Sequence, residues 1–225
     1  MGKLIVFEGT DGSGKSTQFR RLCQRLEEEK IPFQRLIFPQ YDQPSSALIR
    51  MYLGGEFGCH PSDVNAYAAS TFYAVDRYAS WKKVWGDDYR NGGLILADRY
   101  TTSNAVHQAA KLPAEEREEF WRWLEDLEYG KLGLPRPDVV FYMDMPTEKA
   151  VELLRSRESA THTKGDIHEV DTAYLQMCRQ TALHAAGCCG WEKVACVDGT
   201  GQIRSMEEIE TDIWNRMINL EVLQK

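Results

Sequence analysis

The run from Gly9 to Thr17 combines glycines, a lysine and hydroxyls at spacings that suit phosphate chemistry. It fits G-x-x-x-x-G-K-[ST], in which backbone N–H groups surround phosphates, the lysine reaches the β- and γ-phosphates and the hydroxyl ligates Mg²⁺. The alternative is a glycine-rich turn, but an apolar run precedes the motif and a helical run follows it. We therefore predict a P-loop that binds ATP and Mg²⁺ through Gly9, Thr10, Asp11, Gly12, Ser13, Gly14, Lys15, Ser16 and Thr17.

Two other places carry side chains that suit a nucleotide. Asp98 and Arg99 follow an apolar run, where the carboxylate could orient hydrated Mg²⁺ and the arginine could hold a second phosphate. A strand-end ion pair is an equal alternative. Tyr73 and Arg77 lie four residues apart, so on a helix they share a face that could stack on a flat base and bond its edge. The alternative there is ordinary core packing.

Apolar runs that predict strands alternate with amphipathic runs that predict helices. On the long helix we expect an apolar face that includes Ala68 and Val75. The predicted strands span residues 4–7, 33–38, 94–97, 139–143 and 193–197, and the predicted helices span 15–30, 45–53, 62–85, 113–129, 147–157, 170–186 and 205–223.

Alternation of this kind predicts an α/β fold of the P-loop NTPase type, with a five-stranded parallel sheet and helices on both faces. The whole chain, residues 1–225, should form one domain. Ligands bind such sheets at the carboxyl ends of the strands. The segments 8–14, 38–43, 98–108, 144–146 and 198–204 should therefore converge at one edge.

Composition and net charge exclude some classes of binding partner. A net charge of −7 lacks the basic character of a duplex binder, so a nucleic-acid polymer is not expected. No run of residues approaches a membrane span, and we expect no membrane partner. The six cysteines form no C-x-x-C pair, and no signal peptide is recognisable at the N-terminus, which favours a reducing cytoplasm.

These pieces together resemble the thymidylate kinase family, and the resemblance covers nearly the whole chain. It is carried by the P-loop and by five further motifs, with Tyr41 in a position that indicates a bacterial member. The motifs are Phe38-Pro-Gln-Tyr41, Phe72-Tyr-Ala-Val-Asp-Arg77, Asp98-Arg-Tyr-Thr-Thr-Ser-Asn104, Tyr142-Met-Asp-Met-Pro146 and Asp166-Ile-His-Glu169.

The resemblance implies a nucleoside monophosphate kinase that phosphorylates dTMP to dTDP with ATP and Mg²⁺, and a homodimer. It implies that Asp11 lies near the 3′-hydroxyl of the sugar and that Tyr73 stacks on thymine. Mg²⁺ would be held at Ser16 and Asp98. The other residues that it places in the acceptor site are Phe38, Tyr41, Arg77, Arg99, Ser103, Asn104, His107 and Gln108.

Two departures from the family pattern matter. Position 12 is Gly where some relatives carry a catalytic arginine, so the missing cation should come from a lid at about residues 155–170, from Arg155, Arg157 or Lys164. Arg155 and Arg157 are two apart and cannot share a helix face, and Arg157 is favoured. His107 stands where a tyrosine often excludes a 2′-hydroxyl, which leaves selection of deoxyribose open.

The phosphate of the acceptor is mostly dianionic at neutral pH, since its second pKa is about 6, and it needs no general base. Lys15, Arg99 and a lid arginine would supply positive charge, with Asp98 orienting the metal. Other acceptors remain as alternatives: another nucleoside monophosphate, or a deoxynucleoside, for which Glu8 is the obvious base. A third alternative is a regulatory ATP-binding module without an acceptor.

Overall fold

The computed structural model describes residues 1–161, 168 and 171–223. Within these residues, five parallel strands form one sheet in the order β2-β3-β1-β4-β5. The strands are β1 (Lys3–Glu8), β2 (Gln34–Ile37), β3 (Leu94–Asp98), β4 (Val139–Asp144) and β5 (Glu192–Ala195). The predicted α/β class and the five-stranded parallel sheet are confirmed.

Helices connect the strands. The α-helices are α1 (Lys15–Glu28), α2 (Ala47–Leu53), α3 (Ala66–Ser80), α4 (Gly86–Arg90), α5 (Thr101–Ser103), α6 (Arg117–Glu125), α7 (Thr147–Thr161), α8 (Thr172–Cys189) and α9 (Met206–Asn219). The short 3₁₀ turns are η1 (Pro44–Ser46), η2 (Pro61–Asp63), η5 (Ala109–Lys111) and η6 (Ala114–Glu116). Three wider π turns are η3 (Trp81–Trp85), η4 (Asn104–Gln108) and η7 (Asp126–Lys131).

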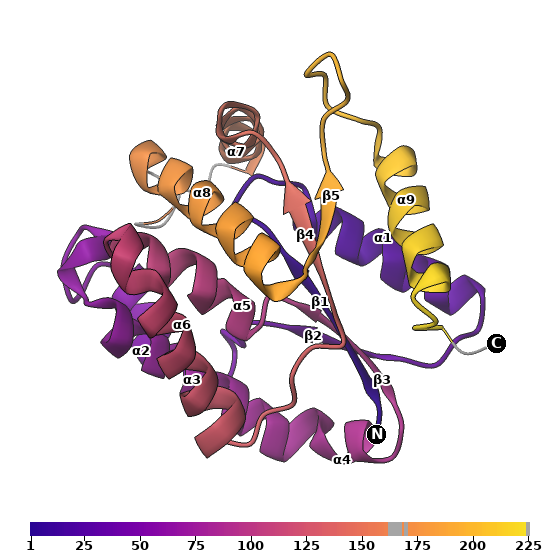
Figure 1. Ribbon diagram of the computed structural model, residues 1–225, viewed down its shortest axis with the longest axis horizontal. Helices are drawn as coiled ribbons and strands as arrows, with labels where there is room; N and C mark the ends of the chain where they lie inside the picture. Colours follow the sequence, from indigo (N-terminus) through magenta and orange to yellow (C-terminus); the bar gives the residue numbers. More distant parts are fainter. Residues whose placement is uncertain (162–167, 169–170, 224–225) are drawn as a thin grey trace.

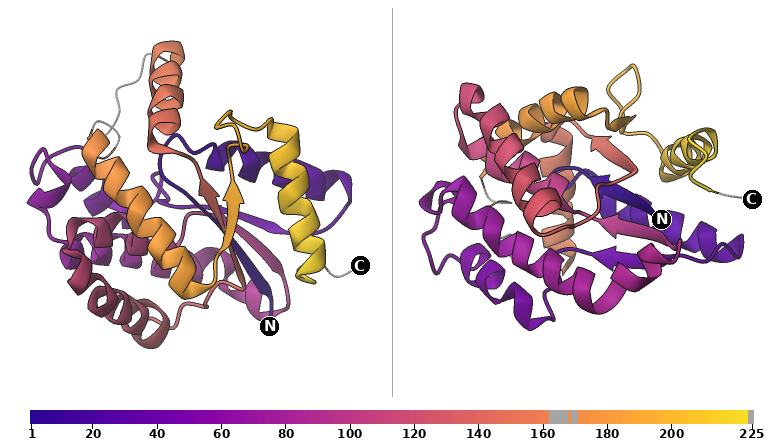
Figure 2. Two further views of the ribbon diagram at one scale, coloured as in Figure 1. Left: turned by 45° about the horizontal axis from the view of Figure 1, so that its top comes forward. Right: turned by 60° about the horizontal axis from the view of Figure 1, so that its bottom comes forward.

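The helices cover both faces of the sheet (Figures 1 and 2). Successive side chains of a strand point to opposite faces, and β1 divides its residues accordingly. Ile5 and Phe7 pack with α1 and α9 in one core cluster. Leu4 and Val6 pack with Trp85 and other aromatic side chains in another. Because β1 is buried on both faces, the P-loop that follows it starts from a rigid base.

The long helix differs from its prediction. It begins at Ala66 rather than near Ser62, because the side chain of Asn65 accepts a hydrogen bond from the Ala68 N–H and caps the helix. The predicted apolar face was also wrong: Val75 is 55% exposed, whereas Arg77 is 2% exposed. The buried face of α3 is rich in alanine and serine, so apolar side chains do not mark it.

The carboxyl ends of the five strands meet at the predicted ligand edge. Phe7 pairs with Asp98 and Asp98 pairs with Ile37 in the sheet register. On the other side of β1, Glu8 pairs with Tyr142 and Asp144 pairs with Ala195, and the segment after β5 is closed by a bridge between Val197 and Ile203. Among the described residues, no helix is both long and apolar enough to cross a membrane.

Candidate active site

The P-loop curls between the end of β1 and the start of α1. Gly12 and Gly14 adopt φ values of 80° and 82°, which L side chains rarely adopt, and Gly14 caps α1. The loop forms one wall of a pocket of about 360 Å³. Lining residues are Thr10, Asp11, Gly12, Ser13, Gly14, Lys15, Ser16, Thr17, Arg20, Leu153, Leu154 and Arg157. Gly9 is not among them, and Arg20 is an addition that sequence analysis missed.

Asp98 holds the two reactive side chains of the P-loop. Its carboxylate forms an ion pair with the Lys15 ammonium and accepts a hydrogen bond from Ser16 Oγ at 2.8 Å. Burial and nearby Arg99 lower the pKa of Lys15, against the opposing effect of Asp98. Hydroxyl and carboxylate oxygens side by side are hard donors that suit Mg²⁺, so these residues fit the predicted metal site.

Helix α7 lies directly on the P-loop at Gly12. A Cβ atom at position 12 would lie 2.2 Å from the carbonyl oxygen of Ala150, so no other side chain fits without a shift of α7. This contact explains why the loop carries no arginine there. Both described lid arginines are exposed, but Arg157 lines the P-loop pocket and Arg155 does not. Lys164 and most of the predicted lid lie outside the described residues.

Arg99 lies where the P-loop meets a second pocket. Its backbone has φ of 69°, a strained conformation for a residue with a side chain. The guanidinium forms an ion pair with Asp11 and lies 3.6 Å from a carboxylate oxygen of Glu8. It also donates to His107 Nε2 at 2.9 Å. Burial alone would lower the pKa of Arg99, but Asp11 and Glu8 raise it, so the side chain stays charged.

Glu8 is a fully buried anchor whose role sequence analysis missed. One carboxylate oxygen accepts from the Gly9 N–H at 3.0 Å. The other accepts from Thr102 Oγ1 and Ser103 Oγ, each at 2.7 Å. With these donors and Arg99 around it, the carboxylate connects the P-loop to the segment that follows β3 and has its hydrogen-bonding capacity occupied. It is therefore a poor candidate for a general base.

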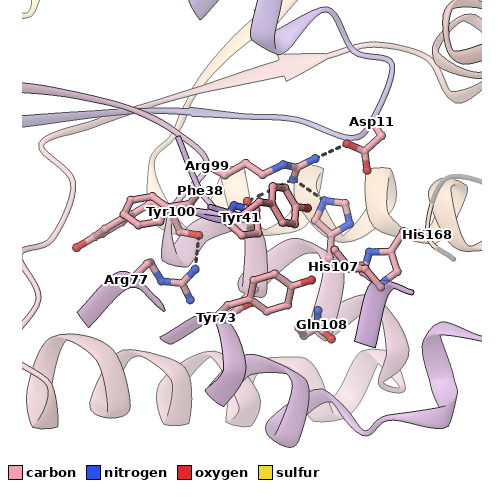
Figure 3. Close-up of a pocket in the computed structure, with 14 residues that line it drawn as sticks. Asp11, Phe38, Tyr41, Tyr73, Arg77, Arg99, Tyr100, His107, Gln108 and His168 are labelled. Carbon is pink, nitrogen blue, oxygen red and sulfur yellow. Dashed lines mark hydrogen bonds and ion pairs between the residues drawn. The ribbon is translucent and has the colours of Figure 1, made fainter. Parts of the chain in front are cut away.

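The second pocket has a volume of about 150 Å³ and collects the predicted acceptor residues (Figure 3). The predicted residues that line it are Asp11, Phe38, Tyr41, Tyr73, Arg77, Arg99, Ser103, Asn104, His107 and Gln108. Pro39, Leu53, Tyr100 and His168 also line it and were not predicted. Figure 3 shows Tyr73 between Arg77 on one side and His107 and Gln108 on the other.

A buried carboxylate fixes each end of this pocket. Asp76 accepts from the Gln40 N–H at 2.8 Å and from Ser45 Oγ at 2.6 Å, which ties α3 to the loop that carries Tyr41. Glu128 accepts two hydrogen bonds from the Arg77 guanidinium at 2.6 and 2.5 Å. Sequence analysis missed both, because the partners lie up to 51 residues apart.

His107 is a buried, neutral imidazole. Burial, followed by the charge of Arg99, lowers its pKa well below the usual value. Arginine can only donate, so His107 Nε2 accepts and Nδ1 carries the proton, directed at Cys178 Sγ at 3.5 Å. The His107 carbonyl accepts from the Tyr174 hydroxyl at 2.6 Å. This side chain therefore serves Arg99 as well as forming part of the pocket wall.

The π turn η4 explains how one short segment supplies so many side chains to the pocket. It contains Asn104, His107 and Gln108, and it follows Ser103 directly. A π turn widens the helix and changes the direction of its side chains, and such turns occur frequently at functional sites. In the described structure Gln108 Oε1 is buried without a hydrogen-bond partner, which suits an atom reserved for a ligand.

Comparison with known proteins agrees with this geometry. The family model described as thymidylate kinase matches residues 7–209. The thymidylate kinase of Mycobacterium tuberculosis (strain H37Rv) is 34% identical over 186 residues, covering 81% of this chain and 84% of the relative. That of Fervidobacterium nodosum is 27% identical over 212 residues, covering 93% and 95%.

The fold also matches a solved structure, the thymidylate kinase from Candida albicans, with a TM-score of 0.72 and 20% identity. The alignment covers 100% of this chain and 96% of that one. The family match over most of the chain and the similarity to the mycobacterial enzyme lead to one conclusion. This chain belongs to the thymidylate kinase family and is a nucleotide-dependent kinase that phosphorylates dTMP.

Proposed function

We propose that the chain transfers the γ-phosphoryl group of ATP, bound with Mg²⁺ at the P-loop, to the 5′-phosphate of dTMP in the second pocket. One observation carries this proposal: Asp11 lines both pockets, and its ion-pair partner Arg99 lines the second. The donor and acceptor sites therefore meet at one charged pair, which is the arrangement that direct transfer between two bound nucleotides requires.

On the donor side, the backbone of the P-loop and Lys15 bind the phosphates of ATP. Ser16 and Asp98 would hold Mg²⁺, which would neutralise charge on the phosphate oxygens. Arg157 reaches the same pocket from α7 and supplies the cation that Gly12 cannot. The lid at about residues 155–170 would complete this side and exclude water.

On the acceptor side, Arg99 and Tyr41 bind the 5′-phosphate of dTMP and Asp11 lies near the 3′-hydroxyl. Tyr73 stacks on the base, and Arg77 and Asn104 bond its edge. Phe38, Ser103, His107 and Gln108 complete the wall. The contact of Asp76 with the Tyr41 loop supports this assignment, because it fixes that loop relative to the helix that carries Tyr73 and Arg77.

The acceptor phosphate is itself the nucleophile, so this chain needs to position and neutralise charge rather than remove a proton. The surroundings of Glu8 support this mechanism. A nucleoside hydroxyl would need a base, and Glu8 already accepts from Gly9, Thr102 and Ser103. This observation argues against a deoxynucleoside as the acceptor.

We propose a homodimer that uses the exposed side of α3. Val75 and Tyr78 on α3 and Leu48 on α2 are large apolar side chains with exposed fractions of 55%, 39% and 46%. Apolar side chains gathered on one side are typical of an interface. Sedimentation of the wild type and of Val75→Glu would test it, since the dimer should dissociate in the variant.

We also propose a reducing, cytoplasmic location. Cys23, Cys178 and Cys196 are buried as free thiols, and the remaining three cysteines are free as well. Burial raises the pKa of Cys23 to about 11, so this thiol is unreactive near neutral pH. Fractionation of the source cells with an antibody against the chain would test the location.

A coupled assay of ADP release across acceptors tests the proposed reaction. ADP should form with ATP, Mg²⁺ and dTMP, and not with ATP alone or with thymidine. UMP and dUMP belong in the same screen, because His107 stands where relatives exclude a 2′-hydroxyl. Release of ADP without any acceptor, or faster turnover of thymidine than of dTMP, would contradict the proposal.

A further inference from the structure

Glu128 is a buried carboxylate that lies behind the acceptor pocket without lining it. It belongs to the π turn η7 and is 0% exposed. Besides Arg77, it accepts from Thr101 Oγ1 at 2.8 Å and lies 3.4 Å from Asn104 Nδ2. A charge buried this deeply is strongly disfavoured unless it is paired and hydrogen-bonded. Here its partners include two residues that face the acceptor base.

The first of these residues is Arg77, whose orientation Glu128 fixes. Nε and Nη2 both donate to the carboxylate, a two-pronged contact that sets the plane of the guanidinium. Nη1 donates to the carbonyl of Tyr100 at 3.3 Å and has a second hydrogen (Figure 3). Arg77 can therefore present a donor to the pocket and no acceptor.

The second residue is Asn104, whose amide could in principle face either way. Nδ2 lies 3.2 Å from the carbonyl of Ser70 and 3.4 Å from Glu128. Both neighbours can only accept hydrogen bonds. An amide turned the other way would place its oxygen against these two oxygens, so Glu128 and Ser70 select the orientation with Nδ2 inward. Oδ1 is then the atom that Asn104 offers to a ligand.

We propose that Glu128 is a positioning residue. By orienting Arg77 and Asn104, it makes the site present a hydrogen-bond donor from Arg77 and an acceptor from Asn104 to the base, so that the site accepts thymine or uracil and rejects cytosine. This inference rests on the proposed function, in which the acceptor base lies against Arg77 and Asn104. Thymine and uracil offer an oxygen at C4 and an N–H at N3. Cytosine offers the reverse, an amine at C4 and an acceptor at N3.

The same geometry separates this role from a purely structural one. A buried ion pair that only stabilised the fold would, when weakened, lower the unfolding temperature and leave the choice between bases unchanged. A positioning role predicts a change in the ratio of kcat/KM for dTMP to that for dCMP. The 5-methyl group neither donates nor accepts a hydrogen bond, so the ratio of dTMP to dUMP should not change.

The test compares Glu128→Gln with wild type. Both carboxylate oxygens accept from Arg77, so whichever way the new amide turns, its N–H group faces a donor of Arg77, and the guanidinium loses its orientation. The ratio of dTMP to dCMP should fall about tenfold or more, the factor for one hydrogen bond to a charged group. The Kd for ATP should not change. Glu125→Gln, the same change at a partly exposed glutamate three residues away, is the matched control.

Two further variants keep the proposal falsifiable. Glu128→Asp retains the charge but withdraws the carboxylate, and it should lower the ratio in the same direction if Glu128→Gln does not fold. Asn104→Ala tests the underlying assignment, because an unchanged ratio there would show that the base lies elsewhere and would overturn both proposals. A lower ratio in Asn104→Ala together with unchanged ratios in the folded Glu128 variants would overturn the role of Glu128 alone.

Discussion

The two pockets of the active site are built in different ways. The P-loop pocket draws on one continuous run, Thr10 to Thr17, with α7 laid across it. The acceptor pocket draws on side chains from the end of β2, from α3, from the end of β3 and from η4. Buried carboxylates hold those pieces together, among them Glu8, Asp76 and Glu128.

This difference has a functional meaning. In the proposed reaction, groups at the P-loop would contact the phosphates of ATP, where charge changes during transfer, so damage there should lower the rate. Most groups in the acceptor pocket would contact the base and sugar of dTMP, which do not react, so damage there should change affinity and selection. Arg99 belongs to both classes, because it pairs with Asp11 of the P-loop and with His107 of the acceptor wall.

The largest effect should come from Lys15→Ala. In the proposed reaction its ammonium would stabilise the charge that develops on the transferring group, and its loss should reduce kcat by about 10³-fold or more. The circular dichroism spectrum should be unchanged, because Lys15 lies in a loop-to-helix turn and not in the apolar core. Lys193→Ala, at an exposed lysine of β5, is the control. Near-normal turnover in folded Lys15→Ala would contradict the P-loop assignment.

A smaller loss of rate should separate the two lid arginines. Arg157→Ala should lower kcat at saturating substrates by about 10²-fold, with little change in the KM for dTMP. Arg155→Ala should be nearly silent, because that exposed side chain does not line the P-loop pocket in the described structure. Equal, wild-type kcat values for both variants would rule out these positions and direct the search to Lys164.

Tyr73→Ala should affect the acceptor pocket alone, with a loss of dTMP affinity rather than of ATP affinity. Loss of stacking should weaken dTMP binding by about 1–3 kcal/mol, the scale measured for base–aromatic stacking. Calorimetry should find the affinity for ATP nearly unchanged, and Tyr73→Phe should behave as wild type because the ring carries the interaction. If ATP binding falls while dTMP binding does not, Tyr73 serves a different part of the site.

The smallest effect concerns Lys111, a partly buried amine outside the acceptor pocket. It donates to Tyr52 Oη at 2.8 Å and to the Val64 carbonyl at 2.9 Å. Burial lowers its pKa from 10.5 to about 7. At pH values between these two pKa values, Lys111 is protonated in the unfolded chain and mostly neutral in the folded protein. The free energy of unfolding should therefore rise with pH, by up to about 1.4 kcal/mol per pH unit.

Lys111→Met should remove this contribution. Urea unfolding at pH 7, 8 and 9 should show a gap between wild type and variant that grows with pH in favour of the wild type. Lys131→Met, at an exposed lysine, should leave the dependence of the free energy of unfolding on pH as in wild type. An unchanged slope in Lys111→Met would mean that this amine stays protonated in the folded protein.

The contrast between the pockets also explains what sequence analysis could and could not find. The P-loop and the strands are local patterns, and both were predicted within a few residues. Arg99, Tyr73 and Arg77 were predicted from their positions and spacing, the other acceptor residues came from the family resemblance, and the structure brings all of them to one pocket. The carboxylates Asp76 and Glu128 were missed, because a contact between segments far apart in the sequence leaves no short spacing to recognise.

The face of α3 was predicted wrongly for a related reason. Its buried side carries Ala69, Ala74 and Arg77, so hydrophobicity does not distinguish it from the exposed side that carries Val75. Small residues allow close approach to the pocket, and Arg77 is tolerated there only because Glu128 pairs with it. Tertiary pairing of this kind overrides the periodic pattern from which the prediction was made.

The contact between Gly12 and Ala150 has a consequence for how such enzymes diverge. An arginine at position 12 would bring its Cβ to within 2.2 Å of the Ala150 carbonyl oxygen, so α7 would have to shift to admit it. Because Arg157 lies on the same helix, such a shift would also change how Arg157 faces the P-loop pocket. We therefore expect substitutions at positions 12 and 157 to have non-additive effects on turnover.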